Sequence, residues 1–453
     1  MNFGFGRLTL ILNLSRCDIH DGLLCFQKNE IRGCQTEVPT TAPTINLRRK
    51  ILSIAYCFLL SSTLLIHLGF HFRISFCCRK LVSSSKNRNV MEPCPFYIPL
   101  FALFAIGCSP ADKGKIAINQ IQIIGSHNSY KQEIERPVME LILAKDSNAI
   151  NLDYAHIPIK DQLDLGLRGL EIDVLHDPQG GRYKEPLALQ KLKEQGVPTQ
   201  PYDTSSELSK GGLKVLHVSD IDFRSHCLLF KNCLLEVKQW SDSNPDHVPI
   251  IITINPKDSG SDEPGFARVL PFTPHVLDSL DQEILSVFSL SDLITPDFVQ
   301  GEFASLREAV TSVGWPSLEV SKGKVLFVLD AGSSVTEMYI KNSLKGKPMF
   351  PNVSADDPNA AFFIMNDPKT QRAEIKERVK AGFMVRTRAD ADTREARVQD
   401  YSRLEAAIES GAQLISTDYY LGRLSPSGKF QVSLKDGKYQ SCNPLIAPVD
   451  CHL

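Results

Sequence analysis

The sequence predicts an α/β fold, a TIM-type (β/α)₈ barrel that forms a single catalytic domain over residues 113–453. Three observations predict it. Apolar runs of strand length alternate eight times with polar segments that suit helices. Many of these runs are rich in Val, Ile and Leu, which is typical of parallel strands buried on both faces. The roughly 340 residues available fit one such barrel with loop insertions.

The predicted elements follow one another along the body of the chain. Strands are expected at residues 121–124, 169–175, 214–218, 249–254, 324–329, 361–365, 382–385 and 413–415. Helices are expected between several of them, at residues 159–165, 227–241, 370–380 and 394–410. The stretch 183–212 is interpreted as a loop insertion. Active residues of such barrels sit at the carboxyl ends of the strands, so the polar residues that end each apolar run are the candidates for the site.

Charge is distributed unevenly along the chain. Residues 1–90 contain 12 Lys and Arg residues against 4 Asp and Glu residues, whereas the remainder contains 38 against 48. An acidic body lacks the clustered basic residues that duplex DNA or RNA requires, so nucleic acid is excluded as a partner. It suits a protein that gathers carboxylates around a cation. Nothing in the sequence implies an obligate protein partner.

The 12 cysteines divide at a similar boundary. Eight lie at or before Cys108, and four lie after it as the couples Cys227/Cys233 and Cys442/Cys451. Neither couple has zinc-finger spacing with nearby His partners. We interpret them as two disulfides that close short loops, which indicates an oxidising compartment. The alternative is four free thiols in a cytosolic protein.

Residues 1–90 are interpreted as an over-extended gene model or a divergent leader, with a transmembrane anchor at 51–72 as the competing interpretation. That run carries no acidic or basic residue of the Asp, Glu, Lys or Arg type and is long enough to span a bilayer. It also follows three basic residues, as the cytoplasmic end of a membrane span often does. Residues 91–108 resemble a signal peptide that starts at Met91 and ends in a bacterial lipoprotein cleavage box, where Cys108 would be lipidated. Both interpretations predict an exported protein, secreted or membrane-anchored.

Two apolar runs contain or precede residues suited to acid–base chemistry and to cation binding. His127 and Asn128 follow the first run and place an acid or base beside a neutral oxygen ligand, although a lone His is more often structural. In the second run, Glu171 and Asp173 share one face of a strand, roughly 7 Å apart at Cα. Such carboxylates repel each other unless a cation or donors compensate them, and hard oxygen ligands suit Ca²⁺ or Mg²⁺. The alternative is a salt bridge with Arg168 or another buried base.

Two further runs extend this pattern. The run at 214–218 contains His217, a second histidine at a predicted strand end. The run at 249–254 continues into Asn255 and Lys257, which share a face by alternation. Asn255 offers another oxygen ligand, and Lys257 either neutralises phosphate or pairs with a carboxylate. Cleavage of a phosphodiester by an internal hydroxyl needs a base, an acid and positive charge near the phosphoryl oxygens, which these residues would supply.

Together the segments resemble the Ca²⁺-dependent phosphoinositide-specific phospholipases C of bacterial type, within the PLC-like phosphodiesterase superfamily. The resemblance rests on six segments in the same order, at residues 125–130, 162–174, 217–220, 255–258, 385–392 and 411–420. It implies a distorted barrel that acts on phosphatidylinositol at a phospholipid membrane surface. The implied products are diacylglycerol and an inositol phosphate, formed through inositol 1,2-cyclic phosphate.

The resemblance also implies roles for individual residues. The catalytic pair would be His127 and His217, and the Ca²⁺ ligands would be Asn128, Glu171, Asp173 and Asn255. Related eukaryotic phospholipases C carry a Glu ligand where this chain has Asn255. A neutral ligand leaves less negative charge around the ion, so weaker Ca²⁺ binding is expected.

Other polar residues are assigned with alternatives. Lys257 and Asp418 are expected to bind substrate, but Asp418 would also suit a role in orienting a catalytic His or in core hydrogen bonding. Arg386 and Arg388 could reach a phosphate, but arginines at strand ends more commonly pair with acids, so we expect ion pairs. His156 and His176 lie near the site in sequence, and for both we expect a structural role.

Two other functions stay open beside the calcium-dependent phospholipase C. The segment around Asp418 also occurs in glycerophosphodiester phosphodiesterases, in which water rather than the inositol 2-hydroxyl attacks phosphorus. A non-catalytic barrel that binds lipid headgroups is disfavoured because both histidines are present. No basic cluster for additional ring phosphates stands out, which favours plain phosphatidylinositol as the substrate.

Overall fold

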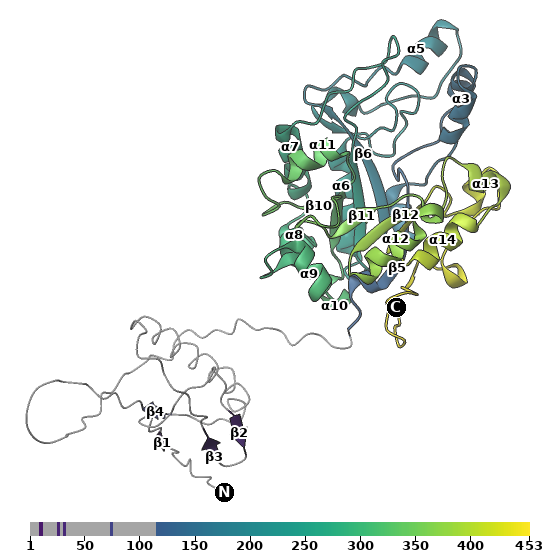
Figure 1. The fold of residues 1–453 in the computed structure, drawn as a ribbon. Helices are drawn as coiled ribbons and strands as arrows, with labels where there is room; N and C mark the ends of the chain where they lie inside the picture. Colours follow the sequence, from purple (N-terminus) through teal and green to yellow (C-terminus); the bar gives the residue numbers. More distant parts are fainter. Residues whose placement is uncertain (1–8, 12–24, 28–29, 33–72, 76–114) are drawn as a thin grey trace, which may run out of the picture. The chain divides into compact units, whose positions relative to one another are not determined.

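The computed structural model describes residues 9–11, 25–27, 30–32, 73–75 and 115–453 (Figure 1). The predicted membrane span at 51–72 and the predicted signal peptide at 91–108 lie outside the described residues. Within the described part of the chain, no helix is both long and apolar enough to cross a membrane.

Four short strands are described before residue 115. The strand β1 (Thr9–Ile11) pairs in parallel with β4 (Arg73–Ser75). The strand β2 (Cys25–Gln27) pairs with β3 (Glu30–Arg32) in antiparallel fashion. The body of the chain, described over residues 115–453, is a separate compact unit.

Eight parallel strands of the body form a nearly closed barrel, which confirms the predicted (β/α)₈ architecture. Starting from β5, one arm runs through β6, β8 and β9 to β10, and the other runs through β13 and β12 to β11. The seam lies between β10 and β11, which no described ladder joins. The barrel strands are β5 (Ile121–Ser126), β6 (Gly169–Asp177), β8 (Ile250–Pro256), β9 (Val325–Leu329), β10 (Met349–Pro351), β11 (Phe362–Ile364), β12 (Met384–Arg388) and β13 (Leu414–Thr417).

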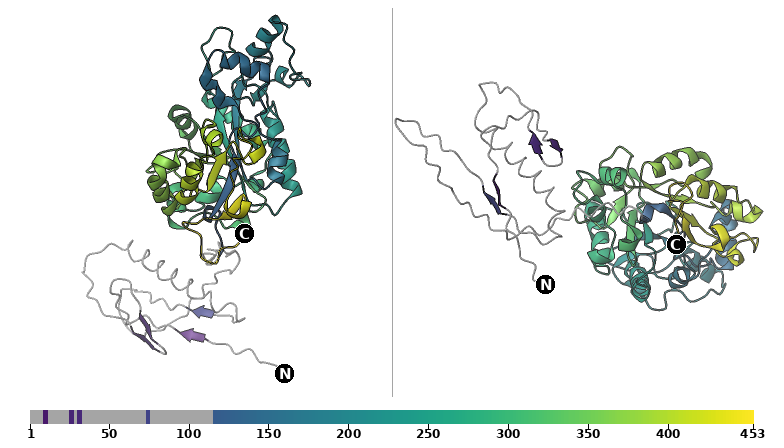
Figure 2. Two further views of the ribbon diagram at one scale, coloured as in Figure 1. Left: turned by 90° about the vertical axis from the view of Figure 1, so that its right-hand side faces the viewer. Right: turned by 90° about the horizontal axis from the view of Figure 1, so that it is seen from below.

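Helices surround this barrel, as the view along its axis in Figure 2 shows. Most of them connect successive strands on the outside, as expected for an α/β barrel. They are α3 (Arg136–Leu143), α4 (Ile159–Asp164), α5 (Leu187–Glu194), α6 (Phe230–Ser243), α7 (Pro274–Leu285), α8 (Pro296–Gln300), α9 (Leu306–Ser312), α10 (Leu318–Ser321), α11 (Ser333–Ile340), α12 (Pro368–Lys380), α13 (Arg394–Val398) and α14 (Ser402–Ser410).

The sequence pattern explains both classes of element. Every residue of β9 is buried, as the continuous apolar run Val-Leu-Phe-Val-Leu requires of a strand covered on both faces. In α6 the buried residues include Phe230, Cys233, Leu234 and Val237, which follow the three- and four-residue spacing of one helix face. Burying a side chain of this size contributes ~1.5–3 kcal/mol, so the core fixes the barrel that carries the polar rim.

One predicted barrel strand was wrong. The run at 214–218 forms only β7 (Gly212–Lys214), which pairs antiparallel with the far end of β6 and stays outside the barrel. The physical reason is that β6 is nine residues long and continues beyond the barrel, where it offers a free edge. The place in the barrel is taken by β10, a three-residue strand between Pro348 and Asn352.

The predicted helix at 394–410 also differs from the structure. It is divided into α13 and α14, because Gln399 adopts a left-handed conformation with φ of 58° at the end of α13. The insertion at 183–212 is confirmed as an excursion beyond β6, and its helix α5 lies beside α3 at the top of Figure 1. Buried Val138 of α3 and Leu192 of α5 belong to one small apolar core.

Two glycines set the distance between β5 and β6. Gly125 and Gly169 are the paired residues of these strands. A Cβ added to Gly125 would lie 2.6 Å from the Gly169 Cα atom, which no side chain allows. The absence of side chains at this crossing therefore brings the carboxyl end of β5 close to the first residues of β6.

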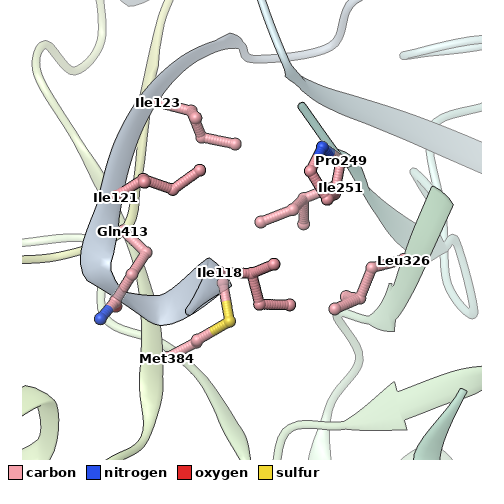
Figure 3. Close-up of a pocket in the computed structure, with 8 residues that line it drawn as sticks. All are labelled: Ile118, Ile121, Ile123, Pro249, Ile251, Leu326, Met384 and Gln413. Carbon is pink, nitrogen blue, oxygen red and sulfur yellow. The ribbon is translucent and has the colours of Figure 1, made fainter. Parts of the chain in front are cut away.

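The opposite end of the barrel is apolar. A small cavity there is lined almost entirely by aliphatic side chains from the barrel strands and from the short 3₁₀ helix before β5 (Figure 3). The residues that line it are Ile118, Ile121, Ile123, Pro249, Ile251, Leu326, Met384 and Gln413. The amino-terminal end of the barrel is thus packed core, and polar side chains accumulate at the carboxyl end.

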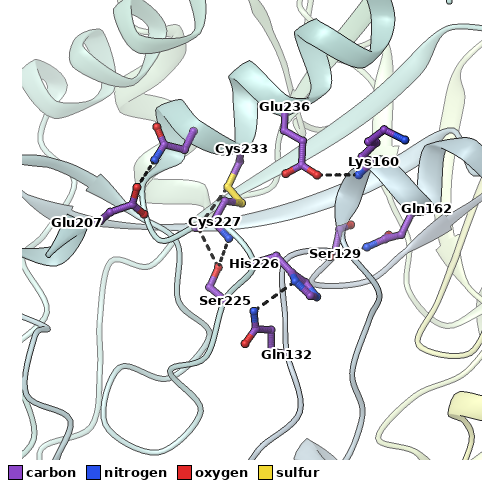
Figure 4. Close-up of a disulfide and its surroundings, with 11 residues drawn as sticks. Ser129, Gln132, Lys160, Gln162, Glu207, Ser225, His226, Cys227, Cys233 and Glu236 are labelled. Carbon is purple, nitrogen blue, oxygen red and sulfur yellow. Dashed lines mark hydrogen bonds between the residues drawn. A yellow bond between two sulfur atoms is a disulfide. The ribbon is translucent and has the colours of Figure 1, made fainter. Parts of the chain in front are cut away.

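Both predicted disulfides are present. Cys227 bonds to Cys233 and ties the start of α6 to the loop that carries Ser225 and His226 (Figure 4). Cys442 bonds to Cys451 near the C-terminus. Residues 440–442 form β14 (Gln440–Cys442), which pairs antiparallel with β5.

Candidate active site

The carboxyl ends of β5 and β13 bring His127 and Asp418 together. The His127 Nδ1 atom lies 2.8 Å from Asp418 Oδ1, and Arg388 Nη2 donates to the other carboxylate oxygen at 3.1 Å. The His127 N–H donates to the Thr417 carbonyl at 3.0 Å, which extends the β5–β13 ladder beyond the strands. Asp418 is only 1 % exposed, and both of its oxygens are engaged.

A second carboxyl group fixes the loop that carries Asp418. Asp390 accepts the Asp418 N–H at 3.0 Å and the Thr417 hydroxyl. Burial raises the pKa of the Asp390 carboxyl to about 7, and the neighbouring Asp418 adds to the shift. The segment 417–418 is therefore held by hydrogen bonds from a residue just beyond β12.

Burial is the largest influence on His127 itself. It lowers the pKa of the imidazole well below its usual 6.5, and the Arg388 guanidinium lowers it further. The Arg388 Nη1 atom lies 3.4 Å from His127 Nε2. With Nδ1–H donating to Asp418, a neutral ring carries its lone pair on Nε2, the atom that Arg388 Nη1 approaches.

Glu171 and Asp173 lie on one face of β6, as predicted, and each has a cationic partner. Glu171 pairs with buried Arg386, and its Oε1 atom lies 3.8 Å from His127 Nε2. Asp173 accepts from Lys257 Nζ at 2.8 Å and from the Tyr130 hydroxyl at 2.8 Å. A basic side chain therefore pairs with each carboxylate, and the one that binds Glu171 is buried.

The arginine predictions can be checked directly. Arg168 donates to the carbonyls of Leu163 and Leu167 and does not pair with the β6 carboxylates. Arg386 and Arg388 pair with Glu171 and Asp418, so the expectation that they pair with acids is confirmed.

His217 is held by a separate set of residues. It lies three residues beyond β7 rather than at a barrel strand end, and its Nδ1 atom is 2.7 Å from Asp222 Oδ2. The other oxygen of Asp222 lies 3.2 Å from Lys131 Nζ, and neither Lys131 nor Asp222 has an exposed side chain. Thus each histidine has a buried carboxylate behind Nδ1.

Tyr154 connects the two histidines. Its ring centroid lies 5.8 Å from that of His127 and 6.5 Å from that of His217. Lys131 Nζ sits 4.5 Å from the centre of the Tyr154 ring and donates to the Tyr154 carbonyl at 2.7 Å. The Asn128 amide donates to the Tyr154 hydroxyl at 2.8 Å. The spacing of the histidines is therefore set by packed side chains.

Asn128 adopts a left-handed backbone conformation with φ of 51°. Asn tolerates this region better than most residues, and such conformations cluster at functional sites. Its amide nitrogen is used by Tyr154, but its buried Oδ1 atom has no hydrogen-bond partner within the described structure.

A sequence model of the family described as "Phosphoinositide phospholipase C, Ca2+-dependent" matches residues 116–444, which is most of the chain. The chain belongs to this family. The predicted family and the predicted enzyme class, phosphoinositide phospholipase C, are confirmed. No curated protein sequence is similar enough to this phospholipase C to count as a match.

Solved structures of similar proteins include three bacterial enzymes. A calcium-dependent phosphoinositol-specific phospholipase C from Pseudomonas is 18% identical, with 74% of this chain and 97% of that chain covered and a TM-score of 0.46. A calcium-dependent phosphatidylinositol-specific phospholipase C from Streptomyces antibioticus is 17% identical, with 67% of this chain and 95% of that chain covered and a TM-score of 0.43. A phosphatidylinositol-specific phospholipase C from Staphylococcus aureus is 11% identical, with 67% of this chain and 87% of that chain covered and a TM-score of 0.38.

The predicted calcium ligands of this phospholipase C can be tested for their fit to a cation. Within the described residues, no three His, Cys, Asp or Glu side chains are gathered closely enough to hold a metal ion by themselves. However, two buried oxygens at the site, Asn128 Oδ1 and Asp173 Oδ1, accept no hydrogen bond from the described residues. Leaving a buried acceptor unsatisfied is costly, and amide and carboxylate oxygens are the ligands that Ca²⁺ prefers. The residues present therefore fit a hard cation.

Asn255 stands next to this pair. It is the register partner of Asp173 across β6 and β8, and its side chain is half-buried. Lys257, two residues further, is bound to Asp173. The structure therefore brings together all of the predicted residues of the barrel rim, and Tyr154 connects His217 to them.

Several residues that shape the site were not predicted from the sequence. Tyr154, Asp222 and Lys131 carry no recognisable signal, because their contacts arise only when the loops fold over the rim. Asp330 did carry one, since it follows an apolar run directly, as Asn255 does. Burial raises the pKa of Asp330 to about 6, while Arg386 opposes the shift.

His156 and His176 take the structural roles that were expected. His156 lies 2.6 Å from the His127 carbonyl through Nε2 and stacks on Tyr420. Burial lowers the pKa of His156 to about 4, so it is neutral near pH 7. His176 packs beside Phe272, away from the histidine pair.

Proposed function

We propose that the protein cleaves phosphatidylinositol to diacylglycerol and inositol 1,2-cyclic phosphate, with His127 and His217 as the acid–base pair. The observation that carries this proposal is the matched pair of histidines, each with a buried carboxylate on Nδ1 and both in contact with Tyr154. A carboxylate in that position fixes the tautomer, so that Nε2 is the atom that exchanges protons with substrate.

His127 is assigned as the base. Its depressed pKa keeps the imidazole neutral near pH 7, so Nε2 can take the proton of the inositol 2-hydroxyl. The alkoxide oxygen then forms a bond to phosphorus as the bond from phosphorus to the diacylglycerol oxygen breaks. His217 donates a proton to that departing oxygen. The reaction leaves a cyclic diester and a neutral alcohol: His127 has gained the proton of the 2-hydroxyl, and His217, which is protonated at the start, has given one to the diacylglycerol oxygen.

The cations of the site suit the negative charge of the phosphodiester. Arg388 is 3.4 Å from His127 Nε2, and Lys257 is about a quarter exposed while it holds Asp173. Donors fixed in advance near a developing oxyanion lower the barrier because they need no reorganisation. We assign Asp418 to the orientation of His127 rather than to substrate binding, since its oxygens are already occupied.

Calcium is assigned to Asn128, Glu171, Asp173 and Asn255. When bound, it supplies positive charge against the phosphoryl oxygens and favours ionisation of the 2-hydroxyl. The support from this structure is the pair of unpaired buried oxygens, together with the half-buried amide of Asn255 beside them.

We further propose that the protein works outside the cytosol at a phospholipid surface. Two disulfides in the body support an oxidising compartment. Residues 91–108 remain the proposed signal peptide and lipoprotein segment, and 113–453 the proposed catalytic domain. Since no basic cluster for ring phosphates stands out in the sequence, plain phosphatidylinositol is the proposed substrate.

A phosphorus-NMR assay tests this function. The full chain is incubated with phosphatidylinositol micelles, once with Ca²⁺ and once with chelator. The proposal predicts a cyclic inositol phosphate signal that vanishes with chelator. Absence of turnover on that lipid, with hydrolysis of glycerophosphoinositol in a parallel sample, would instead assign the protein as a glycerophosphodiester phosphodiesterase.

A further inference from the structure

Asp330 occupies a position on the barrel rim that none of the assigned roles explains. It follows β9 directly, and its N–H donates to the Ile254 carbonyl of β8 at 2.8 Å. That bond continues the β8–β9 register, in which Ile254 is paired with Leu329. Asn255 and Asp330 are therefore the next pair along the two strands.

The same register extends to β6, where Asp173 is the partner of Asn255. Register partners in a parallel sheet point their side chains to the same face, and neighbouring strands lie about 4.8 Å apart. Asp173, Asn255 and Asp330 thus form one row of oxygen-bearing side chains across three adjacent strands. The row lies at the carboxyl end of the barrel, where β6 also carries Glu171.

The side chains of this row have unused oxygens. Asp173 Oδ1 is buried without a hydrogen-bond partner among the described residues. Asn255 and Asp330 are both half-buried, and within the described structure neither side chain makes a hydrogen bond or an ion pair. Three oxygen-bearing side chains at one register position, each with an oxygen that accepts no hydrogen bond from the described residues, call for a partner that the described chain does not supply.

The charges around Asp330 point in the same direction. Its carboxylate is attracted by Arg386 and Lys257 and repelled by Glu171 and Asp173. Arg386 is bound to Glu171 and Lys257 to Asp173, so the two cations are matched by two carboxylates and Asp330 remains as an excess negative charge. A bound cation would compensate that charge and use the free oxygens.

We infer that Asp330 is a ligand of the cation site, and that it supplies from β9 the carboxylate that the neutral Asn255 does not supply from β8. The inference rests on the calcium site of the proposed function and adds a ligand to it. It makes the row Asp173–Asn255–Asp330 one wall of the site, and Asn128 on the β5 loop supplies a further oxygen. The affinity for Ca²⁺ then depends on a residue outside the β5, β6 and β8 segments.

Calorimetric titration of Ca²⁺ into the full chain, without substrate, tests the inference. Asp330→Asn keeps the shape and removes one charge, and we expect it to weaken Ca²⁺ binding ~10–100-fold because affinity follows the charge of the ligand set. The double variant Asn255→Asp/Asp330→Asn returns a carboxylate one strand away and should recover most of the loss. Thermal unfolding without Ca²⁺ should be no lower in Asp330→Asn, since that variant removes a charge that two neighbours repel.

Asp281→Asn is the matched control. Asp281 is a buried carboxylate that pairs with Lys347 and Tyr339 away from the rim, so its removal should leave Ca²⁺ affinity unchanged. Ca²⁺ affinity of Asp330→Asn within twofold of the parent would overturn the inference, and a raised KM for phosphatidylinositol in that variant would place Asp330 on the inositol ring instead. If the parent chain itself binds no Ca²⁺, the calcium site of the proposed function fails, which is a separate result.

Discussion

The two histidines of the site differ in how the chain builds them. His127 stands at the end of barrel strand β5, and its partner Asp418 follows β13, 291 residues later in the sequence. His217 lies on a loop outside the barrel, and its partner Asp222 is only five residues away. Closure of the barrel therefore assembles one half of the site, whereas a local loop assembles the other. The His217 loop must be positioned accurately, and contacts with Tyr154 and with buried Lys131 hold it in place.

Removing either imidazole should give the largest effect. His127→Ala and His217→Ala should each lower kcat on phosphatidylinositol by about 10²–10⁴-fold, the usual contribution of a positioned acid or base. Neither ring belongs to an apolar core cluster, so thermal unfolding should remain cooperative and close to that of the parent. Activity within tenfold of the parent in either variant would contradict the two-histidine mechanism.

Replacing the carboxylate behind each histidine should affect the two histidines differently. Asp418→Asn should lower kcat by roughly 10³-fold, because the neutral amide favours the wrong tautomer of His127. Asp222→Asn should lower kcat as well and should also reduce the free energy of unfolding by about 3 kcal/mol, because Lys131 is left as a buried charge without its ion pair. Steady-state kinetics and urea unfolding measure both effects.

The double variant Lys131→Met/Asp222→Asn serves as the control for this pair. It removes the buried charge together with its partner, so most of the stability should return while kcat stays low. Recovery of activity along with stability would mean that Asp222 acts only through folding.

Acid pH should weaken the fold near His127 first. Burial lowers the pKa of His156 to about 4, whereas the unfolded chain titrates near 6.5, so below pH 6.5 the unfolded state binds a proton that the folded state does not. The resulting loss in the free energy of unfolding is close to zero above pH 6.5 and grows as the pH falls toward 4. Urea unfolding should show a loss of about 2 kcal/mol from this group between pH 7 and pH 5. His156→Gln should show a correspondingly smaller loss.

The smallest effect is expected from the disulfide beside the His217 loop. Cys227→Ser/Cys233→Ser should reduce the free energy of unfolding by about 2 kcal/mol and lower kcat a fewfold, since the loop is less firmly held. Cys442→Ser/Cys451→Ser opens a loop of similar length and should cost similar stability with no change in kcat. Equal effects of both pairs on kcat would show that the His217 loop does not depend on its disulfide.

Continuous apolar runs made most of the barrel predictable. The run before His127 forms β5, the run around Glu171 forms β6, and the run before Asn255 forms β8. The polar residues of these strands meet on one rim of the barrel. The strand β10 escaped prediction because it is three residues long and is bounded by Pro348 and its own Pro351. Propensity weighs against a strand at such a place, and only the closure of the barrel selects it.

The site was less predictable than the fold for a physical reason. A strand ending in a polar residue is visible in sequence, so His127 and the β6 carboxylates could be singled out. The ion pair of Lys131 with Asp222 and the contact of Tyr154 with both histidines depend on how loops pack against each other, which no local pattern encodes. His217 was singled out at the end of a predicted strand that the barrel does not contain, and it lies instead three residues beyond β7.

The division of labour between the two histidines is best measured with an inositol phosphodiester whose leaving group is p-nitrophenolate. This leaving group departs without a proton, so a general acid is no longer needed. If His127 is the base and His217 the acid, His217→Ala should keep at least roughly a tenth of the parent kcat/KM on this substrate, while His127→Ala should stay about 10²–10⁴-fold below the parent. Equal losses in the two variants would contradict this assignment, and rescue of His127→Ala alone would reverse it.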